Sequence, residues 1–202
     1  ALLVVVLFYG SHCVKKQIDT YRAYAAAHEQ RRDEPAPNLK SITGRVTVDP
    51  GTSIELDLQM EISAESGQSL SEALFSLNPG YSITSVEAGG SPAAFEFDHG
   101  LLTVALPGPL EADGTQVIHL EAAGEPDPNF AYIDGNWHSA EAKLSDGFVF
   151  LLGFHPHFFQ SGYVALLDGV RWLPASGSES ARNNPAIRGA DVSDGLPIDL
   201  NA

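Results

Sequence analysis

The stretch that decides the fold lies at residues 54–63 and reads Ile-Glu-Leu-Asp-Leu-Gln-Met-Glu-Ile-Ser. Apolar and polar residues alternate along it without a break, which is the pattern of a β-strand with one buried face and one face in water. Turn sequences separate it from similar runs at 41–48, 81–88, 94–97, 101–106, 116–122, 147–154 and 162–167. Short strands with frequent turns predict a mainly β fold, an antiparallel β-sandwich or saddle-like sheet.

The last part of the chain has a different composition. From Ala175 onward Gly, Ser, Asn and Pro dominate, which predicts loop. Residues 196–200, which read Leu-Pro-Ile-Asp-Leu, predict the start of one more strand.

One helix is expected before the strands, over residues 11–33. Ser11 can cap its start, and few β-branched residues interrupt it. Larger side chains recur at three- and four-residue spacing, at Tyr21, Tyr24, Ala25 and His28. This apolar stripe is weak, so we expect a surface helix and a sheet domain that folds without it from Asn38. The sequence Glu-Pro-Ala-Pro at 34–37 ends the helix, because proline has no amide donor.

The chain opens with an uninterrupted apolar run at residues 1–9 that ends at Gly10. Because a membrane span needs about 20 such residues, the run predicts the end of a transmembrane or signal segment, and a buried β-strand is the alternative. Lys15 and Lys16 lie where residues emerging from lipid would be found. The predicted organisation is therefore this segment at 1–10, a juxtamembrane helix and linker at 11–37, and the sheet domain at 38–202.

The charge of the chain excludes one class of partner. It carries 26 acidic and 11 basic residues, a formal net charge of −15. Such a surface repels nucleic acid, whose binding depends on neutralising phosphates. Cys13 is the one cysteine of the sequence, so neither an intrachain disulfide nor a thiolate-rich metal cluster can form.

The order of three strand motifs resembles the aminopeptidase N family. Residues 81–86 (Tyr-Ser-Ile-Thr-Ser-Val) are followed by 100–107, which end in Leu-Pro, and by 117–124, which end in Ala-Ala-Gly. The segment 170–174 (Val-Arg-Trp-Leu-Pro) is similar to the family's Trp-Tyr-Pro stretch, with Leu173 where an aromatic residue is usual. The resemblance runs from about Ser41 to Pro174 and implies the N-terminal, saddle-like β-sandwich domain of such zinc peptidases.

A second resemblance concerns the order of an apolar segment, a tyrosine-containing helix and the Pro-containing linker before the first strand. This order is similar to that in bacterial membrane proteins in which a permease of the ABC-transporter type is fused to an aminopeptidase N-like region. It implies a membrane-anchored accessory or binding domain that acts with a permease or peptidase subunit and contributes to binding a peptide. The implied location is the extracytoplasmic face of a bacterial inner membrane, although Lys15 and Lys16 alone favour a cytoplasmic flank. The alternative is the N-terminal part of a membrane-bound zinc aminopeptidase whose catalytic domain lies beyond Ala202.

The zinc motif of this family, His-Glu-x-x-His on a helix, has an imperfect counterpart at residues 28–32 (His-Glu-Gln-Arg-Arg). Arg32 stands where the second histidine ligand is required, and its cation would repel zinc. We therefore expect a solvated helix face, with no catalytic residue, no metal ligand and no cofactor in this chain.

The remaining candidates are aromatic and histidine residues near the end of the resemblance. His155-Pro156-His157 places two imidazoles on one side of an extended segment, but the flanking Phe154 favours aromatic packing over metal binding. The resemblance implies that these loops and the segment with Trp172 and Pro174 face a peptide-binding cavity. The expected cavity-facing or packing residues are Phe154, His155, His157, Trp172 and Pro174.

Overall fold

The computed structural model describes residues 2–65, 67–112, 114–130, 133, 159–166, 170–179 and 198–201, with side chains described between residues 15 and 179. Its helices are α1 (Leu2–Gln30) and the short 3-10 helix η1 (Pro128–Phe130). Its longer strands are β1 (Asn38–Asp49), β2 (Ser53–Ser63), β3 (Leu70–Ser76), β4 (Tyr81–Ala88), β7 (Leu101–Leu110) and β8 (Thr115–Gly124). The shorter ones are β5 (Ser91–Pro92), β6 (Phe95–Asp98), β9 (Phe159–Gln160), β10 (Tyr163–Val164), β11 (Ala175–Ser176) and β12 (Ile198–Asn201).

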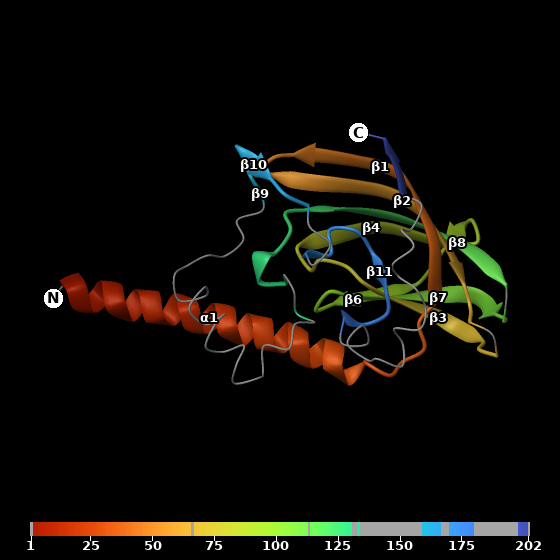
Figure 1. Ribbon diagram of the computed structural model, residues 1–202, viewed down its shortest axis with the longest axis horizontal. Coiled ribbons are helices and arrows are strands. Elements are labelled where there is room, and N and C mark those ends of the chain that lie inside the picture. The colour runs from red at the N-terminus through yellow and green to blue at the C-terminus, as the bar shows by residue number, and fades with distance from the viewer. Residues whose placement is uncertain are drawn as a thin grey trace.

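The strands form two larger sheets that pack together, with the order β12-β1-β2-β8-β4-β5 in one and β11-β3-β7-β6 in the other (Figure 1). The strands β9 and β10 form a separate two-stranded hairpin. Neighbouring strands are antiparallel except β1 and β12, which are parallel. The predicted mainly β architecture of packed antiparallel sheets after one N-terminal helix is thus confirmed.

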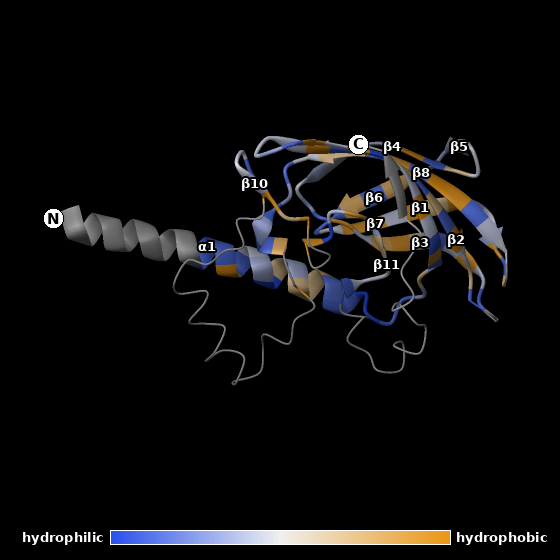
Figure 2. Cartoon of the chain, turned by 45° about the horizontal axis from the view of Figure 1, so that its top comes forward, coloured by the Kyte–Doolittle hydropathy of each residue, from blue (hydrophilic) through white to orange (hydrophobic). Residues whose placement is uncertain are grey.

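Burial along β2 alternates as its sequence predicts. Ile54, Leu56, Leu58, Met60 and Ile62 are buried, and the polar residues between them are exposed. Figure 2 shows the same alternation as orange and blue bands along the strands. The apolar face of β2 contributes to the core shared by the two sheets.

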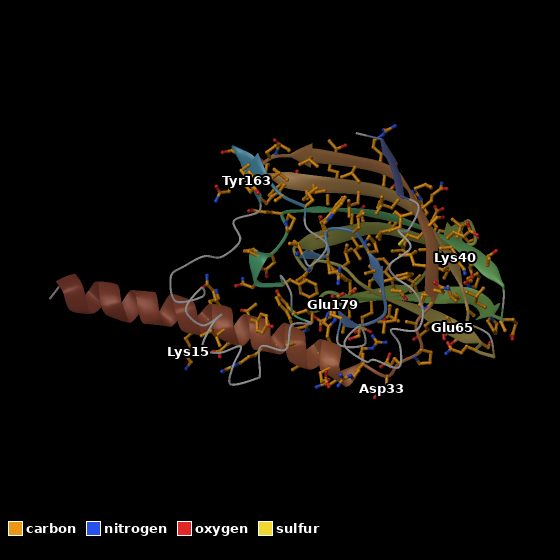
Figure 3. The ribbon with its side chains drawn as sticks, viewed as in Figure 1. Lys15, Asp33, Lys40, Glu65, Tyr163 and Glu179 are labelled. Carbon is orange, nitrogen blue, oxygen red and sulfur yellow. The ribbon has the colours of Figure 1, made fainter. Side chains whose placement is uncertain are left out.

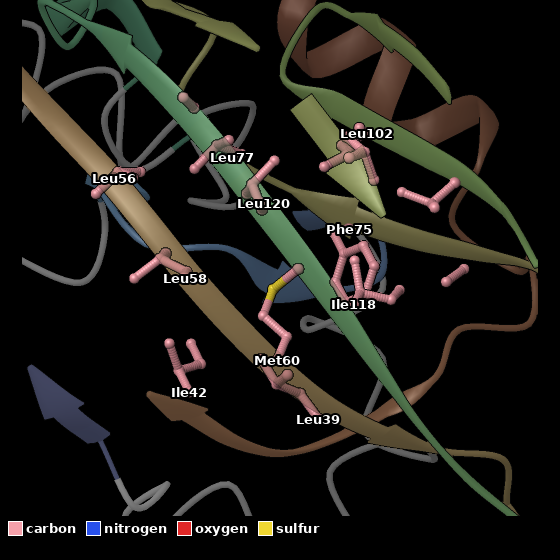
Figure 4. Packing of buried hydrophobic residues seen from close by; sticks show 14 of the residues in the cluster. Leu39, Ile42, Leu56, Leu58, Met60, Phe75, Leu77, Leu102, Ile118 and Leu120 are labelled. Carbon is pink, nitrogen blue, oxygen red and sulfur yellow. The ribbon is translucent and has the colours of Figure 1, made fainter. Parts of the chain in front are cut away.

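The core joins the two sheets through large apolar side chains. Met60 on β2 and Ile118 on β8 lie beside Phe75 on β3, and all three side chains are fully buried (Figure 4). Burial of this kind supplies the main favourable free energy of folding, about 25 cal/mol for each Å² of apolar surface removed from water.

The strand β3 was not predicted, because its sequence does not alternate. Its last four residues, Ala73, Leu74, Phe75 and Ser76, are all buried. Because consecutive residues are buried, both faces of this part of β3 are covered. Its edge pairs with β11, and a hydrogen bond from Gly177 N–H to the Leu74 carbonyl oxygen continues that pairing. A strand buried on both faces shows no period of two.

The helix α1 is continuous over 29 residues, from the apolar run at the N-terminus to Gln30. The alternative that the apolar run is a buried β-strand is therefore wrong, and Ser11 lies inside the helix and does not cap it. The first part of α1 extends away from the sheets, whereas its last part lies against them (Figure 1). Within the described residues, no helix is both long enough and apolar enough to cross a membrane.

Candidate functional site: a buried polar cluster at the end of the helix

Among the described side chains of α1, His28, in the last two turns, is the polar one that is fully buried. Its side chain is fully enclosed, and both ring nitrogens have protein partners. Nδ1 accepts a hydrogen bond from the Glu179 backbone N–H at 3.0 Å, and Nε2 donates one to the His99 carbonyl oxygen at 3.0 Å. These partners assign the tautomer with the proton on Nε2. Burial lowers the pKa of His28 to about 4, despite the opposing effect of the Glu179 carboxylate, so the imidazole is neutral at pH 7.

Next to His28 lies a buried ion pair between Arg171 and Glu179. The distance from Arg171 Nε to Glu179 Oε1 is 2.6 Å, and the two side chains are 3% and 2% exposed. The hydroxyl of Ser76, at the end of β3, donates a hydrogen bond to the same carboxylate oxygen. Figure 3 shows Glu179 between α1 and the sheets. A charged pair is tolerated at this depth because both charges have hydrogen-bonding partners.

The segment 170–179 also closes the end of the helix. The Ser178 hydroxyl donates a hydrogen bond to the His28 carbonyl oxygen, which lies in the last turn of α1, where carbonyls have no partner within the helix. Arg171 has a positive φ of 54°, in the left-handed region that non-glycine residues rarely adopt. Its carbonyl oxygen accepts a hydrogen bond from the Asn78 N–H at 2.9 Å, which contributes to holding this conformation.

Asn78 connects the turn after β3 to two other segments. Its Nδ2 donates to the Val170 and Asp127 carbonyl oxygens, at 2.9 and 3.2 Å. Its Oδ1 accepts from the N–H groups of Gly80 and Asp127, at 2.9 and 2.7 Å. All four hydrogen-bonding positions of this buried amide are therefore used.

One turn before His28, Tyr24 fixes the helix to the segment around η1. Its hydroxyl donates a hydrogen bond to Asp127 Oδ2 at 2.8 Å, and its ring contacts the Phe130 ring edge-on, with centroids 5.4 Å apart. The ring of His28 contacts Phe130 at the same centroid distance. Burial, followed by the bond to Asp127, raises the pKa of Tyr24. The end of α1 is thus held by directional contacts from three segments of the chain.

The expectation of a solvated helix face at 28–32 is wrong for His28, and it is only partly right for Arg31, which donates a hydrogen bond to the Thr103 hydroxyl on β7 at 2.7 Å. Glu29 and Arg32 form an ion pair at 2.7 Å with side chains 57% and 36% exposed. Both nitrogens of His28 are occupied by protein partners, so this imidazole has no lone pair to offer a metal in the observed geometry. The buried cluster therefore has a structural role, because it holds α1, β3 and the segment 170–179 together.

The predicted site residues are only partly within the described chain. Phe154, His155 and His157 lie outside the described residues. Trp172 is half-buried and packs against the main apolar cluster, and its carbonyl oxygen accepts a hydrogen bond from the Tyr81 hydroxyl at 3.1 Å. Pro174 is buried.

A second polar cluster lies on the outer face of the six-stranded sheet. Asp57 on β2 and His119 and Glu121 on β8 each offer one metal-ligand atom, and these three atoms lie within 4.8 Å of one another. Glu87 on β4 approaches His119 from the other side, with 4.0 Å between Oε2 and Nδ1.

Comparison with known proteins gives a partial structural likeness. No protein-family model matches the chain, and no curated protein sequence matches it. Among solved structures, the M1 zinc metallopeptidase from Deinococcus radiodurans is similar, with 19% identity and a TM-score of 0.43, over 48% of this chain and 22% of that chain. A mutant of an M1 zinc metallopeptidase from the same organism, bound to a Tyr-Ser-Ala substrate, has 20% identity and a TM-score of 0.42, over 46% and 21%.

Leukotriene A4 hydrolase from Saccharomyces cerevisiae is similar over 44% of this chain and 15% of that chain, with 11% identity and a TM-score of 0.35. The chain therefore resembles part of M1 zinc metallopeptidases in structure and spans about a fifth of the length of the Deinococcus enzyme.

Proposed function

We propose that this chain is a non-catalytic accessory domain that is anchored to a membrane by α1 and acts with a permease or peptidase subunit, on the extracytoplasmic face of a bacterial inner membrane. The observation that supports the proposal is that α1 is one continuous helix. Its apolar first turns, at residues 2–9, belong to the same continuous helix as Tyr24 and His28, which are bonded to the sheet domain. An apolar segment held in lipid would therefore be joined to the sheet domain without a flexible linker.

The charges along α1 fit its role as an anchor, whereas the extracytoplasmic location rests on the family resemblance, because Lys15 and Lys16 alone favour a cytoplasmic flank. Lys15 and Lys16 are exposed and follow the apolar segment, where lipid headgroups would lie. From Lys16 to Tyr24 the helix rises about 12 Å, at about 1.5 Å per residue. This distance would keep the acidic sheet domain clear of an anionic membrane surface.

Two further observations support an accessory role over a catalytic one. Arg32 replaces the second histidine of the zinc motif, and the first, His28, has both nitrogens committed to backbone partners. By the sequence resemblance, binding of a peptide would involve the loops beside Trp172 and Pro174.

The test combines membrane binding with a peptidase assay on the full chain. It should float with vesicles containing anionic lipid, and Val5→Asp should abolish flotation, because a charge in the apolar segment is costly in lipid. The matched control is Val117→Asp, which makes the same change at a valine that is 47% exposed on β8 and should leave flotation unchanged. Equal flotation of both variants would contradict the anchoring role of α1.

In the peptidase assay, amino-acid arylamides should not be hydrolysed by the chain. Turnover that a chelator abolishes would overturn the accessory role and favour the alternative, a zinc aminopeptidase. A His-Glu-x-x-His motif in the reading frame beyond Ala202 would favour the same alternative.

A further inference from the structure

The outer face of the six-stranded sheet carries an arrangement that the proposed function does not use. Asp57 and Glu121 are register partners on the adjacent strands β2 and β8. His119 precedes Glu121 by two residues, so all three side chains point to the same side of the sheet. The register between the two strands is continuous from Ile54 to Ser63. The three backbone positions are therefore fixed by an uninterrupted ladder.

The imidazole of His119 has a carboxylate on each side. Nε2 lies 2.8 Å from Asp57 Oδ1, and Nδ1 lies 4.0 Å from Oε2 of Glu87, the residue paired with His119 on β4. In metal sites, a ligating histidine typically donates its second N–H to a carboxylate, which orients the ring and raises its basicity. Nε2 is hydrogen-bonded to Asp57 in this structure, so a metal ion would take the place of that bond, with the ring proton on Nδ1. Glu87 could then accept the Nδ1 proton by moving about 1 Å closer, because 4.0 Å exceeds hydrogen-bond distance.

Among the described residues, the strand positions paired around His119 carry more negative than positive charge. Asp57 and Glu121 are directly opposite each other, and like charges in such cross-strand positions are destabilising. Arg45 on β1 is the register partner of Asp57 on its other side and supplies one positive charge to the group. Three carboxylates against one guanidinium leave an excess of negative charge, which a divalent cation beside Nε2 would neutralise.

We propose that Asp57, His119 and Glu121 form a binding site for a divalent transition-metal ion, zinc by its donor set, with Glu87 orienting the histidine. One imidazole nitrogen and two carboxylate oxygens are ligands that Zn²⁺ accepts, and three protein ligands leave a fourth tetrahedral position for water or for a group from a partner. The site is open to solvent, since the side chains of Asp57 and His119 are 59% and 27% exposed. Binding of zinc here needs neither the membrane nor a partner subunit.

The test is isothermal titration of the full chain with Zn²⁺ alone. Wild type should bind one ion that His119→Ala abolishes. Glu87→Gln should weaken it by about 10- to 100-fold, as loss of an orienting carboxylate does elsewhere. The matched control for Asp57→Asn is Glu61→Gln, which removes one negative charge from the same face of β2 outside the cluster. Asp57→Asn should weaken binding at least about tenfold, and Glu61→Gln should not.

A double variant, His155→Ala with His157→Ala, separates this site from the other histidine pair of the sequence. It should retain the ion that His119→Ala removes. The proposal is overturned if wild type binds no zinc, if His119→Ala binds as wild type does, or if Asp57→Asn and Glu61→Gln weaken binding equally. As a second readout, zinc should raise the urea midpoint of wild type but not of His119→Ala, because a ligand that binds only the folded state stabilises it.

Discussion

Replacing Glu179 by alanine tests whether the buried cluster holds the fold together. The substitution removes the carboxylate that pairs with Arg171 at 2.6 Å and accepts the Ser76 hydrogen bond. The Arg171 side chain is 3% exposed, so it would lose this carboxylate without gaining water in its place. Breaking such a buried pair typically costs about 3–5 kcal/mol, which is a large share of the roughly 5–15 kcal/mol that stabilises an ordinary domain.

The assay is urea unfolding at pH 7, followed by tryptophan fluorescence and circular dichroism. The matched control is Glu29→Ala, which breaks the exposed pair with Arg32 and should cost no more than about 1 kcal/mol. The double variant Glu179→Leu with Arg171→Met should recover most of the loss, because replacing both charges by apolar groups leaves no buried charge. If Glu179→Ala and Glu29→Ala shift the midpoint equally, the reasoning about the buried pair is refuted.

Three further predictions concern α1 and the sheets. The free energy of unfolding should rise by up to about 3 kcal/mol between about pH 4 and 6.5. The reason is that His28 stays neutral in the folded chain down to its lowered pKa of about 4, whereas in the unfolded chain it binds a proton over this range. Urea unfolding measured across this pH range should show the rise in wild type but not in His28→Ala. Gly44→Val should cost about 1–3 kcal/mol in urea unfolding, because its Cβ would lie 2.1 Å from a carbonyl oxygen of β2, whereas Gly108→Ala, in open space, should be neutral. Tyr24→Phe should lower the melting temperature, through a loss of about 1 kcal/mol, by removing the hydrogen bond to Asp127.

Much of the fold could be predicted, because one-sided burial leaves a trace in the sequence. The alternation at 54–63 predicted β2 and its buried face, and residues 196–200 predicted the strand that is observed as β12, Ile198–Asn201. The strand β3 could not be found in this way, since a strand covered on both faces has no alternation. The two residues of β11 fall in a segment whose composition predicts loop, and they form a strand because β3 is beside them.

The buried cluster could not be predicted, because its partners are far apart in the sequence and several are backbone groups. His28 bonds to the backbone of His99 and Glu179, which are 71 and 151 residues away. A backbone carbonyl or amide is present at nearly every position, so no residue type marks it as a partner. The sequence at 28–32 resembles an incomplete zinc motif on a solvated helix. It does not predict that His28 is buried, because that burial depends on the distant segments that cover it.

The weak apolar stripe of α1 suggested that the sheet domain is independent of the helix, and the contacts of the helix give a reason to expect otherwise. The stripe reflects only the apolar area of the helix, whereas the contacts described for α1 include hydrogen bonds from Tyr24 and His28 and ring contacts with Phe130. Without α1, the Glu179 N–H would lose its bond to the His28 ring and the Ser178 hydroxyl its bond to the His28 carbonyl oxygen, and each such hydrogen bond contributes about 0.5–1.5 kcal/mol net. Hydrogen bonds are also directional, so they fix the angle of the helix to the sheets more narrowly than an apolar contact of equal area would. A helix that is to hold a domain in a defined orientation gains more from such contacts than from a broader apolar stripe.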